Sequence, residues 1–163
     1  ELDAFLARGG GAVVLHSALI SDDDPEALAK RWGLAAQPKR TKYRHGPVEL
    51  HFAENTASSL IAGFPRLSLV DETYWPMIGD RSQVKVLATA VEDEQEHPMF
   101  WTYTPGQGRV FASVMGHYHA TLEDPLFQVL VLRGLAWSAR EPISRFQSLV
   151  GKQPSDGKIE LRQ

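Results

Sequence analysis

The segment Gly9-Gly10-Gly11-Ala12-Val13-Val14-Leu15-His16-Ser17 is the best starting point for inferring the fold. Its glycines end a predicted helix over residues 2–8, because glycine readily adopts the left-handed conformation that caps a helix. The apolar run at 12–15 does not alternate with polar residues, which is typical of a strand buried on both faces of a parallel sheet. Such a helix and strand form the second half of a βαβ unit. The segment therefore predicts an α/β fold whose first strand is absent from this chain.

The rest of the chain alternates between predicted strands and helices. Helices are predicted where Asp and Pro precede a helix-forming segment, at residues 25–33 and, most apolar of all, 125–137. Strands are predicted at residues 48–52, 66–70, 84–91, 99–104 and 109–115, the last two as a hairpin, whereas the basic segment 37–47 is interpreted as a loop. This pattern predicts an α/β domain with a mostly parallel sheet and one antiparallel hairpin. Residues 1–163 are expected to form a single domain with an irregular tail from about residue 151.

The composition excludes several classes of protein. The 163 residues include 17 Lys and Arg against 20 Asp and Glu, which gives a net charge of −3, and no cysteine. Without a thiol there are no disulfides, thiolate metal sites or cysteine nucleophiles. The mild, evenly spread acidity argues against a nucleic-acid partner, and the one basic cluster is expected on a solvated surface (Lys39, Arg40, Lys42, Arg44). No apolar run approaches the ~18 residues of a membrane span. We expect a soluble, cytoplasmic protein with no membrane partner, although the composition also suits an exported one.

Polar side chains follow three of the predicted strands. These are His16-Ser17 after 12–15, Asp71-Glu72 after 66–70 and Gly116-His117-Tyr118-His119 after 109–115. Ligands of parallel α/β sheets bind beyond the carboxyl ends of the strands, so these groups are expected to share one cleft. Imidazoles and carboxylates together suit general acid–base catalysis. We expect His16 and His117 to be acid–base partners, Glu72 to assist them, and Asp71 and His119 to bind hydroxyl groups.

Two aromatic residues, Tyr74 and Trp75, adjoin the acidic pair. Aromatic rings beside carboxylates and imidazoles are typical of a sugar-binding cleft, where a ring stacks on the apolar face of the sugar. The alternative is that both rings belong to the hydrophobic core. A divalent metal ion is a second alternative for the site, with His16, Glu72, His117 and His119 as its nitrogen and oxygen ligands. No other cofactor is predicted.

Four motifs occur in the order found in a known family. They are residues 9–18, residues 71–75, Gly108-Arg109-Val110-Phe111 leading to Gly116-His117, and Glu123-Asp124-Pro125 leading to Leu132–Trp137. With these motifs the chain resembles the ThuA-like (trehalose utilisation) family from about residue 1 to 140. The segment Tyr43–Pro47 is a less specific match, and it adds His45 to the candidate substrate-binding residues, as Ser17 is added by its place beside His16.

The resemblance implies a fold and a metabolic role. The ThuA-like family is similar in fold to the class I glutamine amidotransferases, a flavodoxin-like three-layer α/β sandwich. Those enzymes have a nucleophilic Cys where this chain has His16 and a catalytic His that His117 matches, so glutamine hydrolysis through a thioester is excluded. The family implies carbohydrate metabolism, with trehalose-like disaccharides or their keto derivatives as substrates.

The sequence therefore predicts a sugar-processing enzyme that works by histidine and carboxylate acid–base chemistry, as an isomerase, lyase or hydrolase. Two alternatives stay open: a non-catalytic carbohydrate-binding or accessory domain, and a metal-dependent hydrolase or isomerase. The apolar helix at 125–137 could also contribute to a homo-oligomer interface.

Overall fold

A computed structural model describes residues 1–53, 60–64 and 66–149. Within these residues the chain forms a six-stranded sheet with the strand order β1-β6-β5-β4-β2-β3. The strands are β1 (Gly11–Leu15), β2 (Lys42–Phe52), β3 (Arg66–Trp75), β4 (Lys85–Glu92), β5 (Gln95–Tyr103) and β6 (Arg109–Ser113). The α-helices are α1 (Leu2–Ala7), α2 (Pro25–Trp32), α3 (His119–Glu123) and α4 (Pro125–Ser138), and 3-10 turns lie at η1 (His16–Leu19), η2 (Arg81–Gln83) and η3 (Ile143–Leu149). The predicted tail from residue 151 lies outside the described residues.

The sheet is mixed, and most of its strand pairs are antiparallel. Only β1 and β6 run parallel, whereas β6–β5, β5–β4, β4–β2 and β2–β3 are antiparallel. The prediction of a mostly parallel sheet is therefore wrong, although the predicted antiparallel hairpin is confirmed as β5–β6. A short apolar run shows that a strand is buried, but it carries no information about the direction of the strand beside it.

Strand β2 starts earlier than the sequence suggested. Residues 42–47, interpreted as part of a basic loop, are strand and pair with Val70–Trp75 of β3. Arg44 forms an ion pair with Glu92 and Lys42 forms one with Asp93. These ion pairs at the end of β4 neutralise the basic charge that had favoured a solvated loop.

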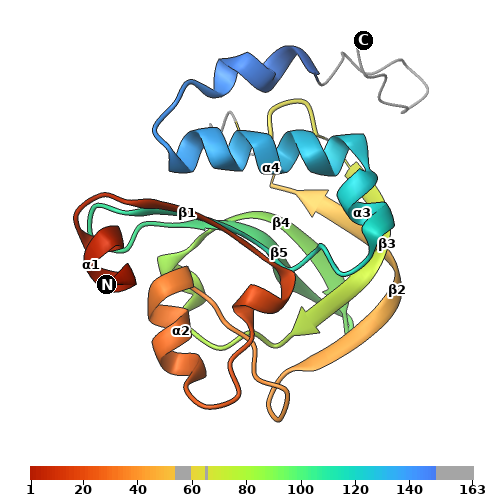
Figure 1. Ribbon diagram of the computed structural model, residues 1–163. Helices are drawn as coiled ribbons and strands as arrows, with labels where there is room; N and C mark the ends of the chain where they lie inside the picture. Colours follow the sequence, from red (N-terminus) through yellow and green to blue (C-terminus); the bar gives the residue numbers. More distant parts are fainter. Residues whose placement is uncertain (54–59, 65, 150–163) are drawn as a thin grey trace.

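Helices cover both faces of the sheet (Figure 1), as the neighbouring residues of β5 and β6 indicate. The indole of Trp101 donates a hydrogen bond to the Trp32 carbonyl at the end of α2, at 2.7 Å. Phe111 lies against α4 so closely that a Cβ atom added to Gly134 would lie 2.4 Å from its ring. Because Trp101 pairs with Ala112, next to Phe111, α2 and α4 cover opposite faces.

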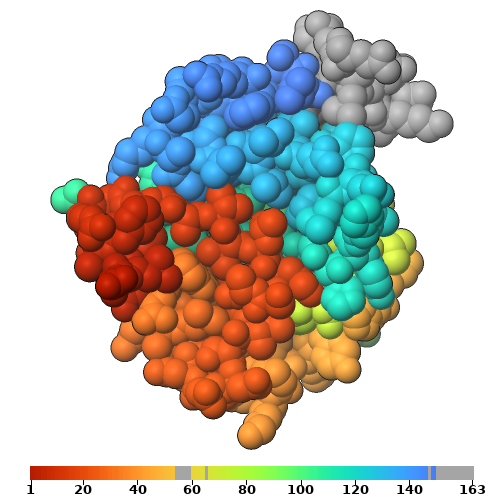
Figure 2. Space-filling model, in the orientation of Figure 1, coloured from red at the N-terminus to blue at the C-terminus, as the bar shows by residue number. Residues whose placement is uncertain are grey.

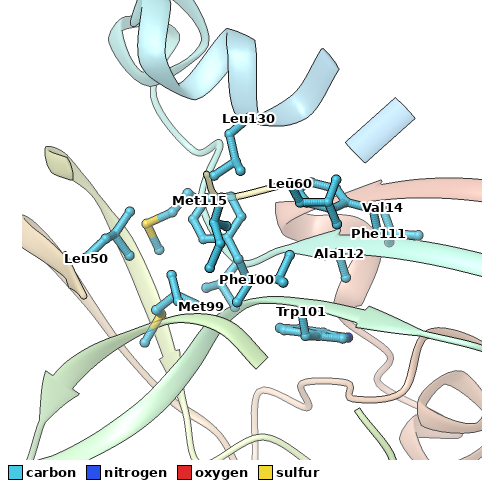
Figure 3. Packing of buried hydrophobic residues seen from close by; sticks show 14 of the residues in the cluster. Val14, Leu50, Leu60, Met99, Phe100, Trp101, Phe111, Ala112, Met115 and Leu130 are labelled. Atoms are coloured by element: carbon cyan, nitrogen blue, oxygen red, sulfur yellow. The ribbon is translucent and has the colours of Figure 1, made fainter. Parts of the chain in front are cut away.

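Part of the hydrophobic core lies between the sheet and α4 (Figure 3), where Leu130 of the helix lies above Met115. Phe100 is fully buried and contacts the rings of both Phe111 and Phe127. Helix α4 begins where the sequence predicts it, since the Asp124 carboxylate accepts hydrogen bonds from the backbone N–H groups of Leu126 and Phe127. No helix within the described residues is long and apolar enough to cross a membrane.

The sheet is curled, and the curl determines where the polar residues meet. Strands β1 and β3 occupy opposite ends of the strand order, yet Nε2 of His16, which follows β1, lies 3.3 Å from Oε2 of Glu72 in β3. The fold is thus α/β, with a mixed sheet whose two ends approach each other at one place.

Candidate functional site

Two histidines enter the site from neighbouring strands. Because β1 and β6 are parallel and Leu15 pairs with Ser113, their carboxyl ends lie side by side. His16 follows Leu15 directly and adopts a left-handed backbone conformation, with φ of 48°. Gly116, with φ of 127°, turns the chain after β6 and is followed by His117. As a result, His16 Nε2 and His117 Nδ1 lie 3.0 Å apart, which confirms that these predicted residues meet.

Glu72 completes the cluster from β3. Its Oε2 lies 3.3 Å from His16 Nε2 and 3.1 Å from His117 Nδ1. Glu72 was expected just after a strand, but β3 continues through it to Trp75. It therefore projects from within the strand, on the same face as Tyr74, two residues later.

Tyr74 lies against the same carboxylate. Its hydroxyl donates a hydrogen bond to Glu72 Oε2 at 2.8 Å, and its ring stacks on that of His16, with 5.3 Å between centroids. Burial, followed by the hydrogen bond to Glu72 and the nearby negative charge, raises the pKa of Tyr74 well above its usual value. Tyr74 thus stays protonated and remains a donor to Glu72.

A backbone carbonyl sets the orientation of His16. The Nδ1–H of His16 donates to the Val114 carbonyl at 3.0 Å, which leaves Nε2 as the nitrogen that faces His117 and Glu72. In the neutral form of the ring, this tautomer presents a lone pair to the centre of the cluster.

His45 and Tyr118 extend the cluster toward solvent. The Tyr118 hydroxyl lies 3.0 Å from His45 Nδ1, and His45 Nε2 lies 3.4 Å from Glu72 Oε1. The ring of Tyr118 also contacts that of His117, with 4.6 Å between centroids, and Tyr43 contacts His45 at 5.7 Å. Tyr118 and Tyr43 are 36% and 65% exposed, so this side of the cluster is open and aromatic.

Asp71 holds the loop that carries His117. It is completely buried, and its carboxylate accepts hydrogen bonds from the backbone N–H groups of Glu72, Gly116 and His117 at 2.7, 2.9 and 2.9 Å. Asp71 was expected to bind substrate hydroxyls, but its oxygens are occupied by the backbone. The contacts make it a residue that positions the loop after β6 against β3.

Three predicted site residues lie outside the cluster. The Trp75 side chain is buried, and its indole donates to Asp93 at 2.8 Å. His119 is on the surface beside Glu123, 3.3 Å away. Ser17 is exposed in η1. Their predicted roles in binding gain no support from these positions.

The basic side chains beside Glu72 are all histidines. Glu72 is 8% exposed, and within the described residues its ion-pair partners are His16, His45 and His117. A buried carboxylate with no Lys or Arg beside it favours cations in its surroundings. The group that could hold a metal ion in the described part of the chain is His16, Glu72 and His117. His119, included in the predicted ligand set, is not among them.

The cluster lies at the surface where segments from distant parts of the sequence meet. In Figure 2 the orange-red surface that follows β1 touches the teal surface of the α3 region, and part of β3 appears below them. Residues 1–138 match the family model described as trehalose utilisation (ThuA). The chain belongs to the ThuA family. Since this match includes every residue of the cluster, the cluster lies within the ThuA domain.

Solved structures show the same fold. A ThuA-like protein from Parabacteroides merdae has a TM-score of 0.72 at 23% identity, over 98% of this chain and 70% of its own. A ThuA-like protein from Bacteroides uniformis has a TM-score of 0.62 at 18% identity, over 82% of this chain and 61% of its own. A β-galactosidase from Bacillus circulans sp. alkalophilus has a TM-score of 0.57 at 13% identity, but this chain spans 21% of it. A search of curated protein sequences found no match.

Sequence reasoning missed the aromatic side of the ThuA cluster. Tyr118 lies between two histidines that were singled out, and Tyr43 lies two positions before His45, a spacing that places both side chains on one face of a strand. That spacing could have identified Tyr43 if residues 42–47 had been assigned to a strand. The role of the Val114 carbonyl could not be identified, because nothing in the sequence indicates where His16 Nδ1 points.

Proposed function

We propose that this ThuA-family chain is a carbohydrate-processing enzyme that acts on trehalose-like disaccharides or their keto derivatives. The observation that carries the proposal is the largely buried Glu72 carboxylate, which lies within 3.5 Å of three imidazoles and opens on one side to exposed tyrosines. Family membership supports the substrate class, and the cluster supports the chemistry.

Proton transfer is the chemistry that this cluster offers. Imidazole and carboxylate groups both accept and return protons. Here the rings of His16 and His117 are within hydrogen-bond distance of each other, and Glu72 lies close to both. A keto group acidifies the neighbouring C–H bond, so a base that removes that proton and an acid that protonates an oxygen would together isomerise the sugar or eliminate a substituent. In this scheme His16 and His117 exchange the proton, and Glu72 stabilises the imidazolium.

The exposed aromatic residues supply a surface for the sugar. Tyr118 and Tyr43 flank His45 on the open side, at 5.9 and 5.7 Å between ring centroids. A tyrosine ring offers an apolar face for the C–H groups of a sugar and a hydroxyl for its oxygens. We propose that the sugar stacks on Tyr118 and Tyr43. Tyr74 acts indirectly, by donating its hydrogen bond to Glu72.

The proposed fold relationship to the glutamine amidotransferases does not extend to their chemistry. The proposed three-layer relationship places His16 where those enzymes have their nucleophilic Cys. A chain without cysteine cannot form a thioester, so the proposed enzyme is not a glutaminase.

A thermal-shift screen followed by turnover assays tests the proposal. Trehalose, related disaccharides and their keto derivatives are added to the full chain, and a ligand at 100 times its Kd is expected to raise Tm by roughly 5 °C. Mass spectrometry of the hit after incubation then detects isomerised or cleaved products. The absence of any stabilising sugar would overturn the substrate class.

The His16→Ala variant separates an enzyme from a binding module. An enzyme loses turnover by about 100-fold, whereas a carbohydrate-binding domain has no turnover to lose and only its affinity falls. His51→Ala is the matched control, because His51 is a partly exposed histidine of β2 whose ion-pair partner is Glu49, outside the cluster. Equal losses in both variants would contradict the proposed role of His16.

A further inference from the structure

Three potential ligand atoms of the cluster form a small triangle. Its corners are His16 Nε2, His117 Nδ1 and Glu72 Oε2, with edges of 3.0, 3.1 and 3.3 Å. We infer that this triangle binds one divalent transition-metal ion, of which Zn²⁺ is the reference case. The inference rests on the cluster and the substrate class of the proposed function, and it replaces proton exchange between His16 and His117, whose facing nitrogens would bind the ion.

The edge lengths suit a metal ion. With ligand bonds near 2.1 Å, neighbouring ligand atoms lie about 3.0 Å apart in an octahedral site and about 3.4 Å apart in a tetrahedral one. The three measured edges fall within or at the border of this range. A proton joins only one pair of these atoms directly by a hydrogen bond. A metal ion outside the plane of the triangle satisfies all three together.

The outer contacts hold two of the three ligands in the form that a metal requires. His16 donates its Nδ1–H to the Val114 carbonyl, so its Nε2 carries a lone pair. Glu72 receives the Tyr74 hydroxyl on Oε2 and faces His45 with Oε1. Metal-bound histidine commonly donates its second N–H to a carbonyl or carboxylate, and ligating carboxylates are themselves hydrogen-bonded.

Charge favours the same conclusion. Glu72 is almost buried, and no Lys or Arg forms an ion pair with it within the described residues. Neighbouring Asp71 is fully buried and bonded to backbone N–H groups. Two consecutive carboxylates thus have neutral or weakly basic partners. A divalent cation would supply the positive charge that the surrounding side chains lack.

The donor set indicates the class of metal and its use. Two imidazoles and one carboxylate suit zinc and other late first-row metals, whereas Mg²⁺ and Ca²⁺ prefer sites made of oxygen. Three protein ligands leave coordination positions open, as in catalytic metal sites. The His117 side chain is 37% exposed, so the open positions can face the side occupied by Tyr118, where a sugar hydroxyl or keto oxygen would bind.

Metal titration of the full chain tests the inference. The protein is purified without a polyhistidine tag, treated with chelator, and titrated with Zn²⁺ by calorimetry. We expect one ion per chain, and about a 100-fold weaker affinity in Glu72→Gln and His117→Ala. Mg²⁺ is expected to give no binding heat at the same concentrations. Addition of Co²⁺ is expected to produce visible absorption bands, which the two variants lose.

His119→Ala is the matched control, because His119 is exposed two residues from His117 and pairs with Glu123. It is expected to bind Zn²⁺ as the unaltered chain does. The inference is overturned if Zn²⁺ does not bind in a one-to-one ratio, or if His119→Ala weakens binding as much as His117→Ala. Circular dichroism of each variant checks that it is folded, and Glu72→Gln keeps the side-chain volume should His117→Ala unfold.

The inference and the proposed function fail in different ways. A sugar that stabilises the metal-free chain and is turned over without added metal would overturn the metal site and support the proton-transfer scheme. Zn²⁺ binding at the cluster, with no sugar from the panel stabilising either form, would support the metal site and overturn the proposed substrate class.

Discussion

The two ends of the sheet contribute to the cluster in different ways. At the β1–β6 end, His16 and His117 lie in the turns beyond parallel strands, where side chains are free to gather. At the β2–β3 end, Glu72, Tyr74 and His45 project from within paired antiparallel strands, where the register fixes each position, and Glu72 is paired with His45. Strand register thus fixes the β3 half of the cluster, whereas turns place the half that follows β1 and β6.

The largest effect is expected from Asp71, whose hydrogen bonds join β3 to the loop after β6. Asp71→Ala removes a fully buried carboxylate that accepts three backbone hydrogen bonds. Because three backbone donors, two of them only partly buried, lose their acceptor together, the free energy of unfolding should fall by about 3 kcal/mol. Urea denaturation measures the loss. Glu49→Ala, an exposed carboxylate paired with Arg66, should cost less than about 1 kcal/mol. Similar losses in both would show that Asp71 does not join the two ends.

The second effect concerns activity. His16→Ala and Glu72→Gln each remove one end's contribution to the cluster, and each is expected to lower turnover about 100-fold. If the ends act as one unit, the double variant should lose little more than either single variant. Steady-state assays with the sugar found by screening measure this coupling. Losses that multiply to about 10,000-fold would indicate two independent sites.

A smaller effect is expected on the face of β3 that turns away from the cluster. Trp75→Phe removes the hydrogen bond from the indole to Asp93 and should lower the free energy of unfolding by about 1 kcal/mol. Sugar affinity should stay unchanged. A decrease in affinity with unchanged stability would show that Trp75 contacts the sugar, as the sequence predicted.

The smallest effect is expected at the β1–β6 end, beyond the cluster. His119→Ala alters an exposed histidine whose partner is Glu123, one helical turn away. The change in stability should stay below about 0.5 kcal/mol, and turnover should be unchanged. A tenfold loss of turnover would show that His119 also contributes to the reaction.

Sequence reasoning succeeded where local patterns determine the structure. Helix α4 begins at its Asp124 cap, the β5–β6 hairpin forms about the predicted turn, and His16 and His117 meet because they follow neighbouring strands. Family membership was also predicted correctly from ordered motifs. Each of these depends on a few consecutive residues.

The remaining features depend on contacts between distant segments. Strand direction in β2, β3 and β4 is set by pairing and not by composition. Asp71 and Glu72 look like the end of a strand because acidic residues are rare in strand interiors, but Gly116, His45 and neighbouring groups satisfy them there. The curl that brings β3 to β1 involves the whole sheet, so sequence periodicity cannot indicate it.

The parallel pairing of β1 with β6 has a consequence for folding. The hydrogen bond from His16 to the Val114 carbonyl spans 98 positions of the sequence, whereas β4 and β5 are separated by a tight turn. Local hairpins form before long chain segments are closed, because closing a longer loop costs more entropy. Within the described residues β1 pairs with β6, so this pairing waits until β6 has been made. The cluster would then be among the last parts of this sheet to form, so its assembly would report that β1 and β6 have paired.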